Sequence, residues 1–266
     1  MNTLTTSNLR LVAGDKMLIE NLNIEFRSGQ SWAILGPNGS GKSTLLHTLA
    51  GLVQPASGTI HYNNRDLNDI AHRYRAQHIG IVFQDFDNAF PTSVLDTVMA
   101  GRHPHLARSL FATESGEDIE RVNCALIKMA LVELADRSIT TLSGGERRRT
   151  DIAVLLAQNP QVRLLDEPSN HLDLYHQHSV LSLLTSMARD DSTGAMNIIA
   201  LHDINQALHY CDHGILLFAD GSVRHGPLKQ IATQSELERL YGCKLIEIES
   251  GQSRLFMPGT LAEKRN

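Results

Sequence analysis

Two stretches of this sequence carry residues that can bind polyphosphate and activate water. The first fits the pattern G-x-x-x-x-G-K-[ST] and runs through Gly36, Pro37, Asn38, Gly39, Ser40, Gly41, Lys42, Ser43 and Thr44. Backbone N–H groups of a glycine-rich turn can surround a polyphosphate closely, and a helix beginning at Lys42 would add the positive end of its dipole. The pattern predicts that Lys42 reaches the β- and γ-phosphates and that the Ser43 hydroxyl binds Mg²⁺.

The second stretch, Val162–Pro168, is an apolar segment that ends in two adjacent carboxylates. Successive side chains of a strand point to opposite faces, so Asp166 and Glu167 can have different roles. We expect Asp166 to hold Mg²⁺ through water and Glu167 to orient or deprotonate the attacking water. Alone, an acidic strand end is as often a solvated cap, and the phosphate loop is what makes it informative. Arg163 interrupts the apolar run, and we expect its side chain to extend toward solvent at the start of the strand.

A third stretch resembles a helix start without a lysine. It comprises Leu142, Ser143, Gly144, Gly145 and Glu146 and precedes a strong helical run. Ser143 and Glu146 have the spacing of a capping box, whereas the two glycines leave backbone amides open to an anion. The chain therefore has two helix starts suited to anions but one lysine-bearing loop. Two chains arranged head-to-tail, each offering this segment to the ATP of the other, would use both.

The elements that position these residues follow from hydrophobic periodicity. Strand patterns cover Leu9–Val12, Leu22–Phe26, Trp32–Leu35, Gly58–Tyr62, Ile79–Phe83, Val162–Leu165, Ile198–Leu201 and Ile215–Phe218. Helical patterns cover Lys42–Leu52, Val94–Ala100, Asp118–Ala130, Gly145–Ala157, Tyr175–Arg189 and Asp203–Tyr210. Strand–helix alternation predicts an α/β domain over residues 1–241 with a parallel sheet, and a helical insertion at about 88–158. Residues 242–266 are expected to form a short extension that begins with a strand pair.

Composition excludes several classes of protein. The chain has 266 residues, of which 42% are hydrophobic and 20% charged, and a formal charge of −5, which disfavours a nucleic-acid partner. Its three cysteines match neither a disulfide scaffold nor a zinc pattern. No apolar run approaches the roughly 20 residues of a spanning helix, and we do not expect MNTLTTSNLR to act as a signal peptide. We expect a cytoplasmic chain that could dock on a membrane protein.

Taken together, these motifs resemble those of a known family, the ATP-binding cassette (ABC) ATPases. The resemblance covers about Leu9 to Leu240 and rests on the phosphate loop, Gln84, Leu142–Glu146, Val162–Pro168, Ser169–Asp173 and His202, which occur in the family's order. It implies a P-loop NTPase core of the ABC type, with an N-terminal antiparallel β subdomain and an inserted α-helical subdomain. It also implies ATP and Mg²⁺ as cofactors.

The resemblance further implies roles for individual residues. Such domains form head-to-tail homodimers with two ATP molecules between them. Gln84 would sense the γ-phosphate and water, join Ser43 and Asp166 around Mg²⁺, and relay the state of the site to a transmembrane partner. Asp173 would contact the opposite protomer. His202 would contact the γ-phosphate and hold the catalytic geometry with Glu167.

Three shorter segments, Gly101–His105, Leu156–Gln158 and Leu201–Ala207, look like those of the ATPase subunits of bacterial iron-siderophore, haem and cobalamin importers. This implies a peripheral ATPase at the cytoplasmic face of the inner membrane, bound to permease subunits and serving an extracytoplasmic binding protein. The alternative is a cytosolic ABC ATPase that drives assembly, for example iron–sulfur cluster formation. Translation-factor and DNA-repair ABC proteins fit the acidic charge less well, and Leu142–Glu146 excludes a P-loop kinase.

Two positions depart from the family pattern. Ala13 stands 29 residues before Lys42, where the family usually has an aromatic residue that stacks on adenine. We therefore expect modest base discrimination and a raised KM for ATP, unless another residue such as Arg10 supplies the contact. Arg148 stands where the family usually has Gln, and its role is left open by the sequence.

Overall fold

The computed structural model describes residues 1–84, 91–106, 115–190, 192–250 and 253–259. Its strands are β1 Thr3–Ala13, β2 Lys16–Arg27, β3 Ser31–Leu35, β4 Ser57–Tyr62, β5 Arg65–Asp66, β6 Ile79–Val82, β7 Val162–Asp166, β8 Met196–Ala200, β9 His213–Leu217, β10 Val223–Pro227, β11 Leu245–Ser250 and β12 Ser253–Pro258. Its α-helices are α1 Lys42–Leu49, α2 His72–His78, α3 Val94–Ala100, α4 Gly116–Lys128, α5 Gly144–Gln158, α6 Leu174–Arg189, α7 Ile204–Tyr210, α8 Leu228–Ile231 and α9 Gln234–Tyr241. Short 3₁₀ turns lie at Val132–Leu134 and Ile139–Thr141.

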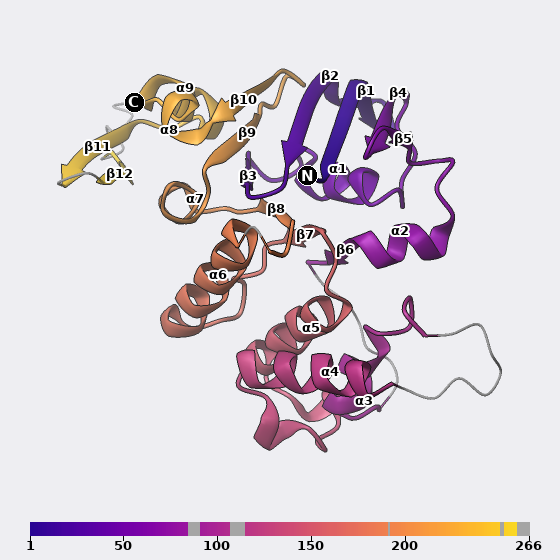
Figure 1. Ribbon diagram of the computed structural model, residues 1–266. Coiled ribbons are helices and arrows are strands. Elements are labelled where there is room, and N and C mark those ends of the chain that lie inside the picture. The colour runs from indigo at the N-terminus through magenta and orange to yellow at the C-terminus, as the bar shows by residue number, and fades with distance from the viewer. Residues whose placement is uncertain (85–90, 107–114, 191, 251–252, 260–266) are drawn as a thin grey trace.

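A six-stranded sheet forms the centre of the molecule, with strand order β10-β9-β3-β8-β7-β6 (Figure 1). Strands β9, β3, β8, β7 and β6 are parallel, as the alternation of strands and helices predicted. One edge strand departs from this parallel arrangement, because β10 runs antiparallel to β9. A tight turn in which Phe218 donates to the Ser222 carbonyl joins these two strands, and so short a connection permits only antiparallel pairing.

Both faces of this sheet are buried, and alternate residues of each strand supply two different cores. In β3, Ala33 and Leu35 join the core on the side of α5 and α6. Trp32 and Ile34 join the core on the side of α1 and the antiparallel sheet. This explains why the central strands read as continuous apolar runs.

The antiparallel β subdomain is a four-stranded sheet of order β2-β1-β4-β5, in the upper right of Figure 1. Its first two strands are longer than the patterns at Leu9–Val12 and Leu22–Phe26 suggested, because pairing continues from Thr3 with Arg27 to Ala13 with Lys16. Register shifts along β1 break the apolar alternation there, which hides the full strand length from a periodicity argument.

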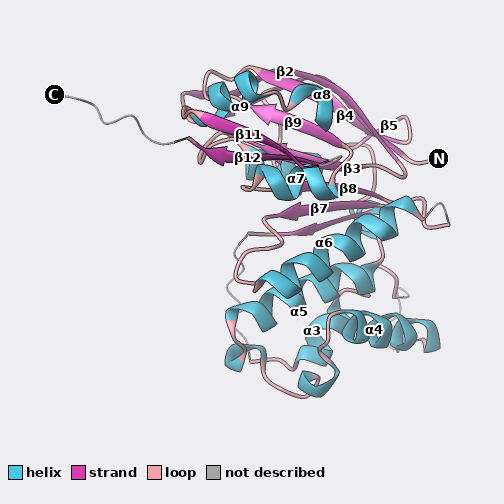
Figure 2. Cartoon of the chain, turned by 90° about the vertical axis from the view of Figure 1, so that its left-hand side faces the viewer, coloured by secondary structure: helices cyan, strands magenta, loops and turns pink. Residues whose placement is uncertain are grey.

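The helical part, α3 to α5, lies beneath the central sheet in both views (Figures 1 and 2). The described residues from 91 to 158 contain helices and turns but no strand, which agrees with the helical character predicted there. Arg102 and Asp118 tie the segment after α3 to α4 through a buried ion pair of 2.8 Å. Helix α2 was not predicted, because none of its residues is buried and it lacks an apolar stripe.

The predicted strand pair after residue 242 is confirmed as the hairpin β11–β12. Asn205 of α7 fixes this hairpin by donating to the Phe256 carbonyl at 3.0 Å and accepting from its N–H at 2.8 Å. Helices α8 and α9, between the sheet and the hairpin, were not predicted. Within the described ranges, none of the helices combines the length and apolar character that crossing a bilayer requires.

Candidate active site

The glycine-rich loop connects the buried strand β3 to α1, as the pattern predicted. Gly36 has no space for a side chain, because a Cβ there would lie 2.5 Å from Ser40 Oγ and 2.7 Å from the Leu217 carbonyl oxygen. Gly41 precedes the helix with a φ of 101°, a conformation that favours glycine. The loop is therefore held tightly against the sheet, and α1 begins at Lys42 without a side-chain cap that would compete with an anion.

Lys42 is buried and points its ammonium group back over the loop. Lys42 Nζ donates to the carbonyl oxygens of Gly36 at 2.9 Å and Pro37 at 3.3 Å. Burial lowers the pKa of Lys42, and the nearby carboxylates of Glu167 and Asp166 act in the opposite direction. The ammonium group therefore spans the loop where the outer phosphates of a bound polyphosphate would lie.

Asp166, the last residue of β7, is 1% exposed. Neither of its carboxylate oxygens has a well-formed hydrogen bond in the described part of the chain. Burial raises the pKa of this carboxyl, and the Ser43 hydroxyl beside it acts in the opposite direction. A buried carboxylate with so little hydrogen bonding fits a hydrated divalent cation, and Ser43 on α1 offers a further oxygen.

Glu167 follows Asp166 and is the convergence point of three side chains from separate segments. Gln84 Nε2 donates to Glu167 Oε2 at 3.2 Å. Asn170 Nδ2 donates to the same oxygen, and His202 Nε2 contacts the other one. Glu167 itself adopts a φ of 51°, a left-handed conformation rare for a side-chain-bearing residue. The Glu167 side chain is 5% exposed, whereas that of His202 is 46% exposed and faces the open side of the site.

The structure thus brings together Lys42, Asp166, Glu167 and His202, with Gln84 beside them. Asn170 also contacts Glu167; this residue lies inside the segment Ser169–Asp173 but was not predicted as a site residue. In the sequence, the signal for this contact is that Asn170 is a polar residue three positions after Glu167. The described residues contain no group of three or more His, Cys, Asp or Glu side chains placed to hold a metal ion among themselves.

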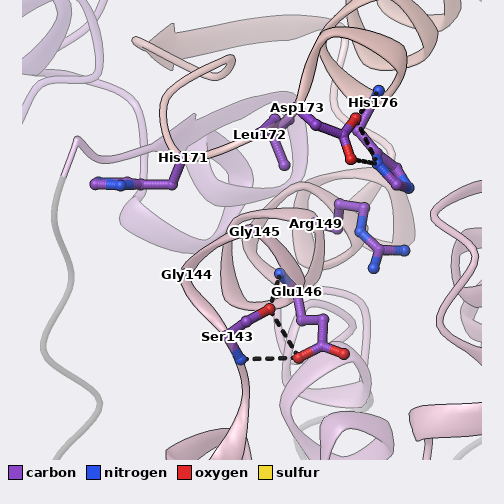
Figure 3. Close-up of a pocket in the computed structure, with 9 residues that line it drawn as sticks. All are labelled: Ser143, Gly144, Gly145, Glu146, Arg149, His171, Leu172, Asp173 and His176. Carbon is purple, nitrogen blue, oxygen red and sulfur yellow. Dashed lines mark hydrogen bonds and ion pairs between the residues drawn. The ribbon is translucent and has the colours of Figure 1, made fainter.

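The helix start at Ser143 forms the predicted capping box. Glu146 N–H donates to Ser143 Oγ at 3.3 Å, and Glu146 Oε2 accepts from Ser143 N–H and Oγ–H, each at 2.8 Å (Figure 3). Gly145 has a second function, because a Cβ at that position would lie 3.0 Å from the His171 carbonyl oxygen. The glycines therefore allow the start of α5 to approach the loop before α6 closely.

A pocket of about 450 Å³ opens between this helix start and the loop at His171–Asp173. Figure 3 shows Arg149 between the Ser143–Glu146 capping box and the side chains of Asp173 and His176. Asp173 caps α6, accepting from the His176 N–H at 2.8 Å, and its side chain is 67% exposed. The pocket is lined by the cation Arg149 and by the first residues of α5, but no equivalent of Lys42 or Glu167 is among its lining residues.

Ala13 ends β1 at the tip of the first hairpin, exposed and paired with Lys16. Lys16 Nζ donates to the Gly39 carbonyl at 2.8 Å, so this tip is fastened to the phosphate loop. The first aromatic residue of the sequence is Phe26, which is fully buried. Position 13 is therefore placed near the loop, as expected, but offers a methyl group in place of an aromatic face.

Known proteins resemble this chain over nearly its whole length. The family profile described as ABC transporter matches residues 19–170. The ferric enterobactin transport ATP-binding protein FepC of Escherichia coli K12 is 38% identical over 94% of this chain and 92% of its own. The hemin import ATP-binding protein HmuV of Escherichia coli O157:H7 is 34% identical over 91% and 93%.

Two solved structures resemble the fold closely. A metal-chelate type ABC transporter in an inward-facing conformation aligns with a TM-score of 0.82 and 31% identity, covering 97% of this chain and 98% of that chain. A bacterial ABC transporter cassette in a dimeric structure aligns with a TM-score of 0.73 and 30% identity, covering 85% and 98%.

Proposed function

This chain belongs to the ABC transporter ATP-binding proteins, and we propose that it is the ATP-hydrolysing subunit of an importer for a metal chelate. The observation that carries the hydrolytic part is the convergence of Gln84, Asn170 and His202 on the buried Glu167, at the sheet edge where Lys42 crosses the phosphate loop. The cargo class, an iron-siderophore, haem or cobalamin, rests on relatives whose names describe ferric enterobactin, hemin and cobalamin import.

The proposed reaction uses the residues as follows. The loop amides and Lys42 bind the β- and γ-phosphates of ATP and neutralise their charge. Mg²⁺, held by Ser43, Gln84 and Asp166, would supply further charge neutralisation. Glu167 accepts a proton from the attacking water, and Gln84 and Asn170 fix the orientation of its carboxylate. His202 holds the open side of Glu167 and meets the γ-phosphate.

A second copy of the chain completes the site in this proposal. The Ser143–Glu146 pocket offers helix amides but holds no lysine or catalytic carboxylate of its own, so it suits the ATP bound by another protomer. Asp173 borders the pocket, and the next two residues, Leu174 and Tyr175, are 83% and 73% exposed. Large exposed apolar side chains beside an anion pocket favour burial against a partner.

The membrane partner would be a permease, with this chain attached at the cytoplasmic face. The structural relative that is a metal-chelate type transporter supports this arrangement. Co-purification of the tagged chain with a polytopic membrane protein is the measurement that checks it. A chain that stays in the soluble fraction while its gene neighbours are expressed would favour the assembly role instead.

The hydrolytic site is tested by Glu167→Gln. This change keeps the shape of the side chain and removes the base, so we expect no measurable ATP hydrolysis and an ATP-bound dimer on gel filtration with Mg-ATP. The double variant Lys42→Ala/Glu167→Gln is the control and should remain monomeric, because it cannot hold ATP. A Glu167→Gln variant that stays monomeric at saturating Mg-ATP, with and without the permease, would contradict the head-to-tail dimer.

A further inference from the structure

Arg148 lies one turn into α5 and is 4% exposed, an unusual position for a guanidinium group. Its Nη1 donates to the Phe83 carbonyl and its Nη2 to the Asp166 carbonyl. The Asp151 carboxylate, three residues further along the same helix, lies 4.0 Å from Nη1 and partly balances the charge. The side chain therefore crosses from the helical part of the molecule to the ends of two strands of the central sheet.

The two carbonyl groups that Arg148 binds belong to residues directly before two residues of the active site. Phe83 follows β6 and precedes Gln84, while Asp166 ends β7 and precedes Glu167. Strands β6 and β7 are adjacent and parallel, with Val82 opposite Leu165. A planar guanidinium that donates to both strand ends fixes their spacing, which in turn sets the distance between Gln84 and Glu167.

The same helix begins at the pocket that the proposed function assigns to the ATP of the second protomer. Ser143 caps α5, and Arg148 lies five positions further along the chain. Because an α-helix is stiff over one or two turns, a displacement of its start by a bound phosphate would carry the guanidinium with it.

We propose that Arg148 is a positioning residue that transmits occupation of the Ser143–Glu146 pocket to the Gln84–Glu167 pair of the same chain. The inference rests on the proposed function, since it needs a phosphate in that pocket. Arg148 does not touch nucleotide in this arrangement; it acts through the backbone of Phe83 and Asp166. It also accounts for a residue whose role the sequence left open.

The test compares Arg148→Met, which keeps the length and removes the donors, with Arg148→Lys, which can still donate to one carbonyl. Arg121→Met, on the exposed face of α4, is the matched control and should leave activity unchanged. For Arg148→Met we expect kcat to fall by about 10- to 100-fold, as when a catalytic group is displaced by an ångström or less. The Kd for Mg-ATP should stay within about twofold of wild type, and Arg148→Lys should retain more turnover than Arg148→Met.

The same substitution in the Glu167→Gln background distinguishes loss of coupling between the pocket and the Gln84–Glu167 pair from damage to the pocket itself. We expect Arg148→Met/Glu167→Gln to form the ATP-bound dimer as readily as Glu167→Gln, because the capping box is intact. Loss of that dimer, a kcat within about twofold of wild type, or equal losses of ATP affinity and thermal stability would overturn the inference. If Arg148→Met does not fold, Arg148→Gln carries the same comparison. Failure of the Glu167→Gln parent to dimerise would instead count against the proposed function.

Discussion

Gln84 donates a hydrogen bond of 3.2 Å to Glu167 although the two residues are 83 positions apart in the sequence. The contact exists because β6 and β7 are adjacent and parallel, so the residues that follow them meet at one edge of the sheet. His202 reaches the same carboxylate from the segment after β8, the next strand in the order. The catalytic geometry is thus set by strand order.

His202→Ala tests the outermost of these contacts. We expect kcat at saturating ATP to fall by about 100-fold or more, because Glu167 loses its contact with the imidazole of His202 and the γ-phosphate loses a donor. The Kd for ATP should change little, since Lys42 and the loop are unaffected. His209→Ala, an exposed histidine on α7, is the control; undiminished turnover in His202→Ala would remove its assigned role.

Ala13 provides a test of base recognition. We expect similar KM values for ATP and GTP, because the methyl group at position 13 cannot stack on a purine. Ala13→Tyr should lower both KM values by about tenfold, the size of one base–aromatic stack of ~1.4 kcal/mol. Asp15→Tyr places the same ring two residues further along the turn and should lower the KM values less. A strong ATP preference in the wild type, lost on changing another residue, would show that position 13 is not the base contact.

Asp118 provides a test of stability against pH. Hydrogen bonds from Ser115 and the buried Arg102 hold the pKa of this carboxyl at about 2, below its usual 3.8. A depressed pKa stabilises the fold above the unfolded value and loses that contribution as the pH falls through the folded value. In urea unfolding, Asp118→Asn should therefore be less stable than wild type at pH 7, with a difference that shrinks below about pH 4. Glu117→Gln, at an exposed neighbour, should show no such trend.

Replacing Arg163, in contrast to Asp118, is expected to stabilise the fold. The expectation that its side chain reaches solvent is wrong: it is 1% exposed, and none of its guanidinium nitrogens has a hydrogen-bond partner in the described ranges. Burial lowers its pKa to about 10. Because a buried unpaired cation is costly, Arg163→Met should raise the free energy of unfolding by about 1–4 kcal/mol. Arg163→Lys keeps the charge and should not; a less stable methionine variant would mean that the cation has a partner in solution.

The sequence alone determined the parts of the site that are local in the chain. The phosphate loop, the acidic end of β7 and the capping box at Ser143 each consist of residues within ten positions, where backbone chemistry decides the conformation. The apolar runs likewise predicted the central strands, because a strand buried on both faces has no room for polar residues. The hairpin β11–β12 was also predictable from its own residues.

Tertiary structure alone decided which distant residues meet. Strand order brought Gln84 and His202 to the Glu167 carboxylate, and helix packing placed Arg148 against the Phe83 and Asp166 carbonyls. Periodicity describes one element at a time, so it could identify neither the partners of Arg148 nor the burial of Arg163. The physical reason is that burial and long-range hydrogen bonds depend on the whole arrangement of elements, whereas turns, caps and apolar patterns depend on neighbouring residues.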